Sequence, residues 1–165
     1  MKYLCFIALL AATVSYAGPL DDKGPPYFVD RYGPPKSSTN DKATSYAHIK
    51  RGIVSVPGQF STRHFKDGDL TVEAVFFLPS LRLATARYRL PHRWTEDQVD
   101  AALRAYGGEW NRTKQGALVT RWEAPDGTTA AYILNTLFIH SKELVTMGEK
   151  VLEAEEAKRK AMPRF

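Results

Sequence analysis

Alternation of apolar and polar positions predicts strands in the middle of the chain. Residues 70–78 place Val72, Ala74 and Phe76 on one face of an extended backbone, and the opposite face also becomes apolar toward the end of this run. A strand that is apolar on both faces is typical of the centre of a sheet. Pro79 ends the run.

Other runs with strand character stand on both sides of this central strand. The further predicted strands are residues 46–56, 59–65, 81–90, 117–123 and 128–140. Pro57-Gly58 and Pro125-Asp126-Gly127 are the turn signals between neighbouring runs. The pattern therefore predicts an antiparallel sheet of about five to seven strands.

Helical periodicity appears in two places. Residues 96–106 carry an apolar stripe, Thr95 is suited to the N-cap, and Gln98 completes a capping box. Ser141 is suited to the N-cap of a C-terminal helix that is apolar on one side in its first half and charged at its end. We expect an α+β fold in which the sheet packs on one face against this central helix and the C-terminal helix.

The residues before the predicted sheet resist regular structure. Prolines are frequent in residues 18–45, among serine, threonine, asparagine and aspartate. One helical turn is expected inside this segment at residues 27–32, because Pro26 suits a first helical position and Gly33 suits a C-terminal cap. The remainder is predicted to be a flexible segment, followed by a single α+β domain over residues 46–165.

The first seventeen residues have the pattern of a secretory signal peptide. Lys2 supplies a positive start, an apolar run follows, and Ser15-Tyr16-Ala17 places small residues at cleavage spacing. The apolar run is shorter than the roughly 20 residues that span a bilayer. We therefore expect an exported protein, periplasmic or secreted, without a transmembrane segment once residues 1–17 are removed.

Composition narrows the class of protein further. Removal of residues 1–17 from the 165-residue chain leaves about 148 residues, enough for one domain with one core. Loss of Lys2 lowers the formal net charge from +5 to +4, a mild excess without the long basic run typical of a nucleic-acid arm. The single cysteine, Cys5, lies in the predicted leader, so the mature protein is expected to have no disulfide.

Local signatures of catalysis are missing from the sequence. The four histidines, His48, His64, His92 and His140, are far apart, and neither an H-E-x-x-H nor a G-x-S-x-G motif occurs. The sequence thus predicts no cofactor, no metal site and no catalytic residue that can be named. An active site assembled from distant strands, with His48, His64 or Glu73, stays open as an alternative.

An arginine cluster is the strongest candidate for binding. Arg87 and Arg89 share a face of the predicted strand 81–90, and Arg93 and Trp94 follow in the next turn. Guanidinium groups beside an aromatic ring suit an anionic polymer, a carboxylate or an acidic protein surface. The alternative is an ordinary solvated sheet face on which arginine stems cover apolar surface.

The sequence also contains a weak internal repeat. Tyr32-Gly33 and Lys66-Asp67-Gly68 in the first half correspond to Tyr106-Gly107 and Pro125-Asp126-Gly127 in the second. Tandem duplication is one interpretation. Independent use of glycine as a helix stop and of Asp-Gly as a turn is the other.

The first part of this layout resembles a known family. A short helix that ends at Tyr32-Gly33-Pro34, followed by strands and by Asp67-Gly68 before residues 70–77, is similar to exported domains of the SmpA/OmlA type. The resemblance implies a small antiparallel sheet and a role in binding or assembly in the bacterial envelope, with secreted β-lactamase inhibitor proteins among the related folds. The lipid-bearing cysteine of the lipoprotein members has no counterpart here.

These observations favour an exported, non-enzymatic interaction or assembly module of the bacterial envelope. Its expected partner is an envelope protein or an anionic polymer, not nucleic acid. Two alternatives remain. One is a secreted hydrolase with a nonlocal active site, and the other is a polysaccharide or cell-wall binding domain that uses Arg87, Arg89 and Trp94.

Overall fold

The computed structural model describes residues 20, 23–116 and 118–162, so the predicted leader at residues 1–17 lies outside the described residues. Its helices are α1 (Pro25–Tyr32), α2 (Glu96–Tyr106) and α3 (Lys142–Ala161). Its strands are β1 (Ser37–Ile49), β2 (Gly52–Asp67), β3 (Leu70–Phe77), β4 (Leu83–Arg89), β5 (Asn111–Gln115), β6 (Val119–Glu123), β7 (Thr129–Ile133) and β8 (Thr136–His140). None of the helices within these residues is long and apolar enough to cross a membrane.

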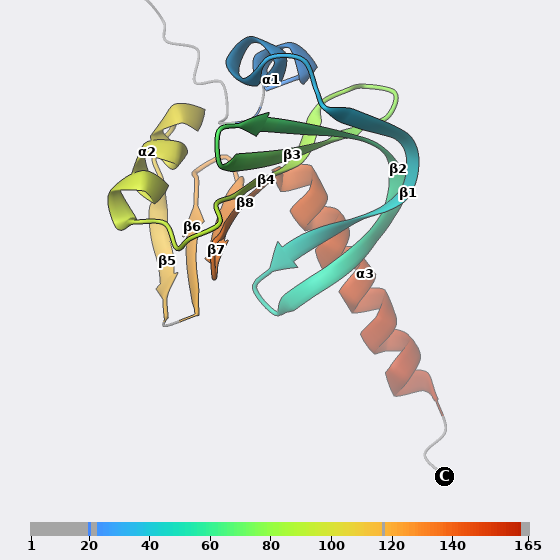
Figure 1. Cartoon of the computed structure of the whole chain (residues 1–165). Helices are drawn as coiled ribbons and strands as arrows, with labels where there is room; N and C mark the ends of the chain where they lie inside the picture. Colours follow the sequence, from blue (N-terminus) through green and yellow to red (C-terminus); the bar gives the residue numbers. More distant parts are fainter. Residues whose placement is uncertain (1–19, 21–22, 117, 163–165) are drawn as a thin grey trace, which may run out of the picture.

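The eight strands form one antiparallel sheet in the order β1-β2-β3-β4-β8-β7-β6-β5. The chain passes twice through the same sequence of elements, a helix followed by four strands, and the last strands of the two passes, β4 and β8, pair at the centre (Figure 1). Gly33 and Gly107 end α1 and α2 with φ of 74° and 78°. This repeated order agrees with the interpretation of the internal repeat as a tandem duplication.

One side of the sheet, the α1/α2 side, is covered by the first two helices. Phe28 of α1 is fully buried and lies against the rings of Phe65 and Phe76, at centroid distances of 5.8 and 5.7 Å. Val99 and Leu103 of α2 belong to the same core. The apolar stripe and capping box predicted for residues 96–106 are confirmed, since Thr95 accepts a hydrogen bond from the backbone of Gln98.

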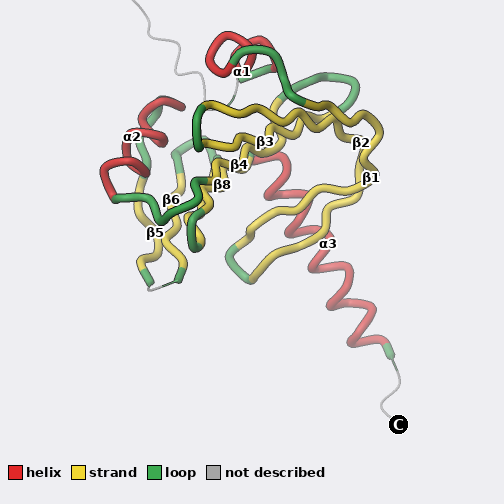
Figure 2. The backbone as a smooth tube through the Cα atoms, in the orientation of Figure 1, coloured by secondary structure: helices red, strands yellow, loops and turns green. Residues whose placement is uncertain are grey.

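The other side, the α3 side, carries α3 and the curled end of the long β1–β2 hairpin (Figures 1 and 2). Leu144 of α3 is fully buried in a second core with residues of β1, β2, β3 and β4. A Cβ on Gly148 would lie 3.2 Å from Ala47 Cβ and 3.3 Å from Ile49 Cγ2, so this glycine allows the helix and hairpin to approach closely. The expectation that α2 and the C-terminal helix cover the same face is therefore wrong.

The predicted fold class differs from the structure in its count of elements. A sheet of about five to seven strands with one central helix and a C-terminal helix was expected, whereas eight strands and three helices account for 46% and 28% of the described residues. The short turn expected at residues 27–32 is a regular helix that begins at Pro25. It is stabilised by burial of Phe28, which a proline-rich composition does not reveal.

The boundaries of the first hairpin differ most. β1 begins at Ser37, inside the segment predicted to be flexible, because its exposed polar residues pair with β2 and need no buried face. The chain turns at residues 50–51, and β2 continues through Pro57-Gly58. Pro57 is tolerated there because β3 pairs with β2 only from Phe60 onward, so β2 is an edge strand at this position.

The second half contains two strands more than predicted. Residues 128–140 are not one strand but β7 and β8, joined at Leu134 and Asn135, with Leu134 at φ 59°. A leucine in the left-handed region is not a turn signal that sequence reasoning recognises. β5 is exposed along its whole length and has no apolar alternation, so it was also missed.

Replacement of Leu144 tests how firmly α3 holds the hairpin. Leu144→Ala is expected to lower the free energy of unfolding by about 2–5 kcal/mol, because it leaves a cavity between helix and sheet. Urea denaturation followed by circular dichroism measures the change. Ile53→Ala on the exposed surface of β2 is the control, expected to cost less than about 1 kcal/mol; equal losses would contradict the assignment of Leu144 to the core.

Candidate functional site

The α3 side of the sheet carries a row of mostly polar side chains on directly paired positions of adjacent strands. This inner row consists of His64, Glu73, Arg87, Phe138, Ala131 and Arg121. Directly paired residues point to the same face of a sheet, so these side chains lie side by side across six strands. Arg87, Phe138 and Arg121 are each partly exposed.

A second row runs parallel to the first at the next outward-facing position. The outer row consists of Lys66, Thr71, Arg89, Thr136, Ile133 and Val119. Lys66 and Arg89 are exposed. We call Lys66, Arg87, Arg89 and Arg121 the basic sheet face. In the two rows, Glu73 is the single carboxylate opposite these four cations.

Arg87 is held rigidly at the centre of the basic sheet face. Its Nη1 lies 3.0 Å from Glu73 Oε1, and its guanidinium stands 5.9 Å from the ring centroid of Phe138. Both side chains of the ion pair are mostly buried, with exposed fractions of 27% and 20%. Packing and pairing thus fix the direction of the guanidinium before any ligand arrives.

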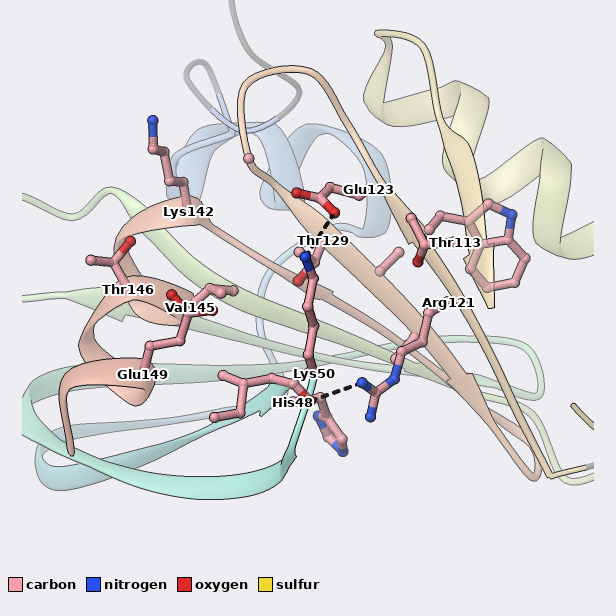
Figure 3. Close-up of a pocket in the computed structure, with 15 residues that line it drawn as sticks. His48, Lys50, Thr113, Arg121, Glu123, Thr129, Lys142, Val145, Thr146 and Glu149 are labelled. Carbon is pink, nitrogen blue, oxygen red and sulfur yellow. Dashed lines mark hydrogen bonds and ion pairs between the residues drawn. The ribbon is translucent and has the colours of Figure 1, made fainter. Parts of the chain in front are cut away.

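Arg121 connects the two halves of the chain. Its Nη1 donates a 2.9 Å hydrogen bond to the carbonyl oxygen of Ile49, at the end of β1 (Figure 3). Lys50, in the adjoining turn, lies 4.0 Å from Glu123 of β6. These contacts dock the hairpin end of the first half on β6 of the second half.

A cavity of about 200 Å3 lies between this hairpin turn, β6, β7 and α3 (Figure 3). Its charged lining residues are Lys50, Arg121, Lys142, Glu123 and Glu149. Three cations opposite two carboxylates leave the cavity nearly balanced in charge. The basic sheet face, with four cations and one carboxylate, is the more strongly positive surface.

Two buried histidines meet where the hairpin end reaches the sheet. Nδ1 of His48 lies 2.9 Å from Nε2 of His140, and the backbone N–H of His48 donates to the same Nε2 at 3.4 Å. Because Nε2 of His140 accepts the backbone hydrogen bond, it carries no proton, and His48 must donate through Nδ1. The ring of His48 also lies 4.2 Å from that of Phe138.

Both imidazoles are held neutral by their surroundings. Burial, together with the positive charges of Arg87 and Arg121, lowers the pKa of His48 to about 4. Burial and the neighbouring His48 and Arg87 lower the pKa of His140 well below its usual value. Both rings of the hydrogen-bonded pair are therefore uncharged at neutral pH.

The structure places the four residues of the predicted binding cluster on opposite sides of the sheet. Arg87 and Arg89 share the α3 side, as their spacing predicted. Trp94 is buried in the core of the α1/α2 side, where its backbone N–H donates to the Tyr132 hydroxyl and its Nε1 donates to the Asn135 carbonyl. Arg93 is exposed beside it. Trp94 therefore cannot stack on a ligand held by Arg87 and Arg89.

The residues named for a nonlocal active site are only partly brought together. Nδ1 of His64 lies 3.9 Å from Oε2 of Glu73, but His48 pairs with His140 instead. Over the described part of the chain, no three histidine, cysteine, aspartate or glutamate side chains gather as a metal site would require. The neighbours of Glu73 are Arg87 and His64, an arrangement that suits an ion-pair network better than nucleophilic attack.

Sequence reasoning missed Arg121, Phe138 and the pairing of His140 with His48. Phe138 and His140 share a face in any regular strand, so their proximity was available from the pattern. The contact with His48 was not, because it depends on the curvature of the hairpin.

Acid is expected to destabilise the fold through the histidine pair. The folded pKa of His48, about 4, lies below the unfolded value of 6.5, so the unfolded chain binds more protons as the pH falls. Stability is then fully present above pH 6.5 and decreases toward pH 4. For His48 alone the loss between pH 7 and pH 5 is about 2 kcal/mol. Urea midpoints across this range measure it.

His48→Asn should reduce this pH dependence without abolishing it, because His140 stays as a buried imidazole while position 48 no longer binds a proton. His92→Asn, on an exposed loop, should leave it unchanged and is the control. The same slope in wild type and His48→Asn would contradict the assignment.

Comparison with protein-family models, curated proteins and solved structures finds no match for this chain. The resemblance to SmpA/OmlA domains therefore stays a prediction.

Proposed function

We propose that this protein is an exported, non-enzymatic interaction module of the bacterial envelope that binds an acidic protein segment through the basic sheet face. The observation that carries the proposal is the set of four cations, Lys66, Arg87, Arg89 and Arg121, in two adjacent rows that contain one carboxylate. Export rests on the pattern of residues 1–17.

The spacing of the cations suits an extended polypeptide. Arg87 and Arg89 are two residues apart on β4, a separation of roughly 6.5–7 Å along the strand. Alternate side chains of an extended ligand repeat at the same distance, so carboxylates at positions i and i+2 can face the two guanidiniums together. A guanidinium accommodates a carboxylate through two parallel hydrogen bonds.

Apolar groups between the cations favour a protein over a polysaccharide. Phe138 lies in the inner row, and Ile133 and Val119 lie in the outer row, all partly exposed. A polyanionic sugar presents less apolar surface to these side chains than a peptide, whose aliphatic side chains can cover them. The hydrolase alternative receives less support, because Glu73 is engaged with Arg87.

Binding of a decapeptide of alternating aspartate and threonine tests the proposal. In 15N NMR titrations, the amide signals of β3, β4 and β8 are expected to shift, and binding should weaken with added salt. The double variant Lys66→Ala, Arg89→Ala should lower the affinity about fivefold or more, because each exposed ion pair contributes roughly 0.2–1 kcal/mol.

A control variant and a second ligand show whether the loss of affinity is specific to the basic sheet face and to a peptide. Arg159→Ala, Lys160→Ala removes the same charge from the exposed end of α3 and should leave the affinity within about twofold. Equal losses in the two double variants would contradict the proposal. Tighter binding of alginate than of the peptide would support the polysaccharide alternative instead.

A further inference from the structure

Two exposed leucines lie side by side at one end of the sheet. Leu118 precedes β6, and Leu134 follows β7. Val119 and Ile133 are paired, so the two leucines occupy the next position of the same antiparallel ladder. Their exposed fractions are 69% and 68%, the largest among the exposed large apolar side chains of the described residues. Paired leucines in solvent form an apolar surface that folding alone does not require.

Leu134 also has an unfavourable backbone. Its φ of 59° lies in the left-handed region, where glycine or asparagine would be less strained. Neither burial nor turn geometry thus explains a leucine at this position. Strained backbone combined with an exposed apolar side chain is typical of a binding position.

The leucines border a hollow of about 260 Å3 on the α1/α2 side of the strand ends. Leu118, Leu134, Tyr132 and Thr120 line it, with Arg93 and Asn135 supplying its polar groups. Its volume is sufficient for one large apolar side chain of a partner. Arg93 adds a positive charge at its wall, which suits a ligand that is acidic as well as apolar.

The hollow lies around the strand ends from the outer row, because its two leucines directly adjoin Val119 and Ile133 in the chain. Ile133 and Val119 belong to the outer row, in line with Arg89 and Thr136. Leu134 and Leu118 are the next residues along the chain, and they point to the opposite side. An extended ligand on the outer row therefore reaches the leucines by passing over the ends of β6 and β7.

We propose that the acidic segment bound by the basic sheet face carries a large apolar side chain that inserts between Leu118 and Leu134. This inference rests on the proposed function and specifies the chemistry of the partner: an acidic stretch that ends in leucine, isoleucine or phenylalanine. Buried apolar anchors contribute most of the affinity of such interfaces, while the charged groups supply orientation and association rate.

The probe is the alternating aspartate–threonine decapeptide with one added leucine at either end, compared with the same peptides carrying asparagine there. For one of the two ends, leucine is expected to raise the affinity of the wild-type protein about tenfold over asparagine. NMR signals of residues 118, 132 and 134 should shift only with that leucine peptide.

Leu134→Asn is the decisive variant. Asparagine tolerates a positive φ, so the melting temperature should stay the same or rise, while the advantage of the leucine peptide should fall to about twofold or less. Ile53→Asn, an equally apolar change at an exposed position of β2, is the matched control and should keep the full advantage.

The outcomes separate the two proposals. If the aspartate peptides do not bind the wild type at all, the proposed function fails. If they bind but leucine and asparagine peptides have equal affinity, or if Leu134→Asn keeps the leucine advantage, the apolar anchor is wrong and the basic sheet face stands.

Discussion

The docking of the β1–β2 hairpin end on the second half of the chain is the contact on which the shape of the α3 side depends. Three interactions make it: the His48–His140 hydrogen bond, the Arg121–Ile49 hydrogen bond, and burial of Leu144 beneath the hairpin. Two of these replace water around polar groups with protein partners, and the third removes apolar surface from water. Because they join residues about 70 to 90 positions apart, the curvature of β1 and β2 is a tertiary property.

The same contact determines which part of the sheet stays open. α3 and the hairpin end bury the row that contains Thr85 and His140 and contact the inner row at Phe138 and Arg121, whereas the outer row with Arg89 lies beyond this cover. The polar network around Glu73 then serves two purposes. It compensates a partly buried carboxylate, and it holds the guanidinium of Arg87 beside Glu73. A surface of this kind costs little stability and leaves charge available for a partner.

Local signals predicted what depends on local chemistry. Thr95 and Gln98 form the capping box that their spacing indicates, and the alternation in β4 places Arg87 and Arg89 on one face. The failures have a common cause. β1 and β5 are held by hydrogen bonds to a neighbouring strand without an apolar face, and the turn at Leu134 uses a residue type that normally avoids it. Which strands pair, and where a strained turn is tolerated, depend on contacts with distant parts of the chain. The contributions of Arg121, Phe138 and the His48–His140 pair to the candidate site could therefore not be predicted.

The central pairing of β4 with β8 has a consequence for the modular character of the chain. Each helix-plus-four-strand unit ends in a strand whose outer hydrogen-bonding groups are satisfied by the equivalent strand of the other unit, which runs antiparallel to it. A unit produced alone would expose the unpaired backbone N–H and C=O groups of that strand, with which another strand could pair. Since the arrangement is antiparallel, two copies of one unit could meet there in the same way, and a self-paired assembly would reproduce the architecture that one polypeptide now encodes in tandem.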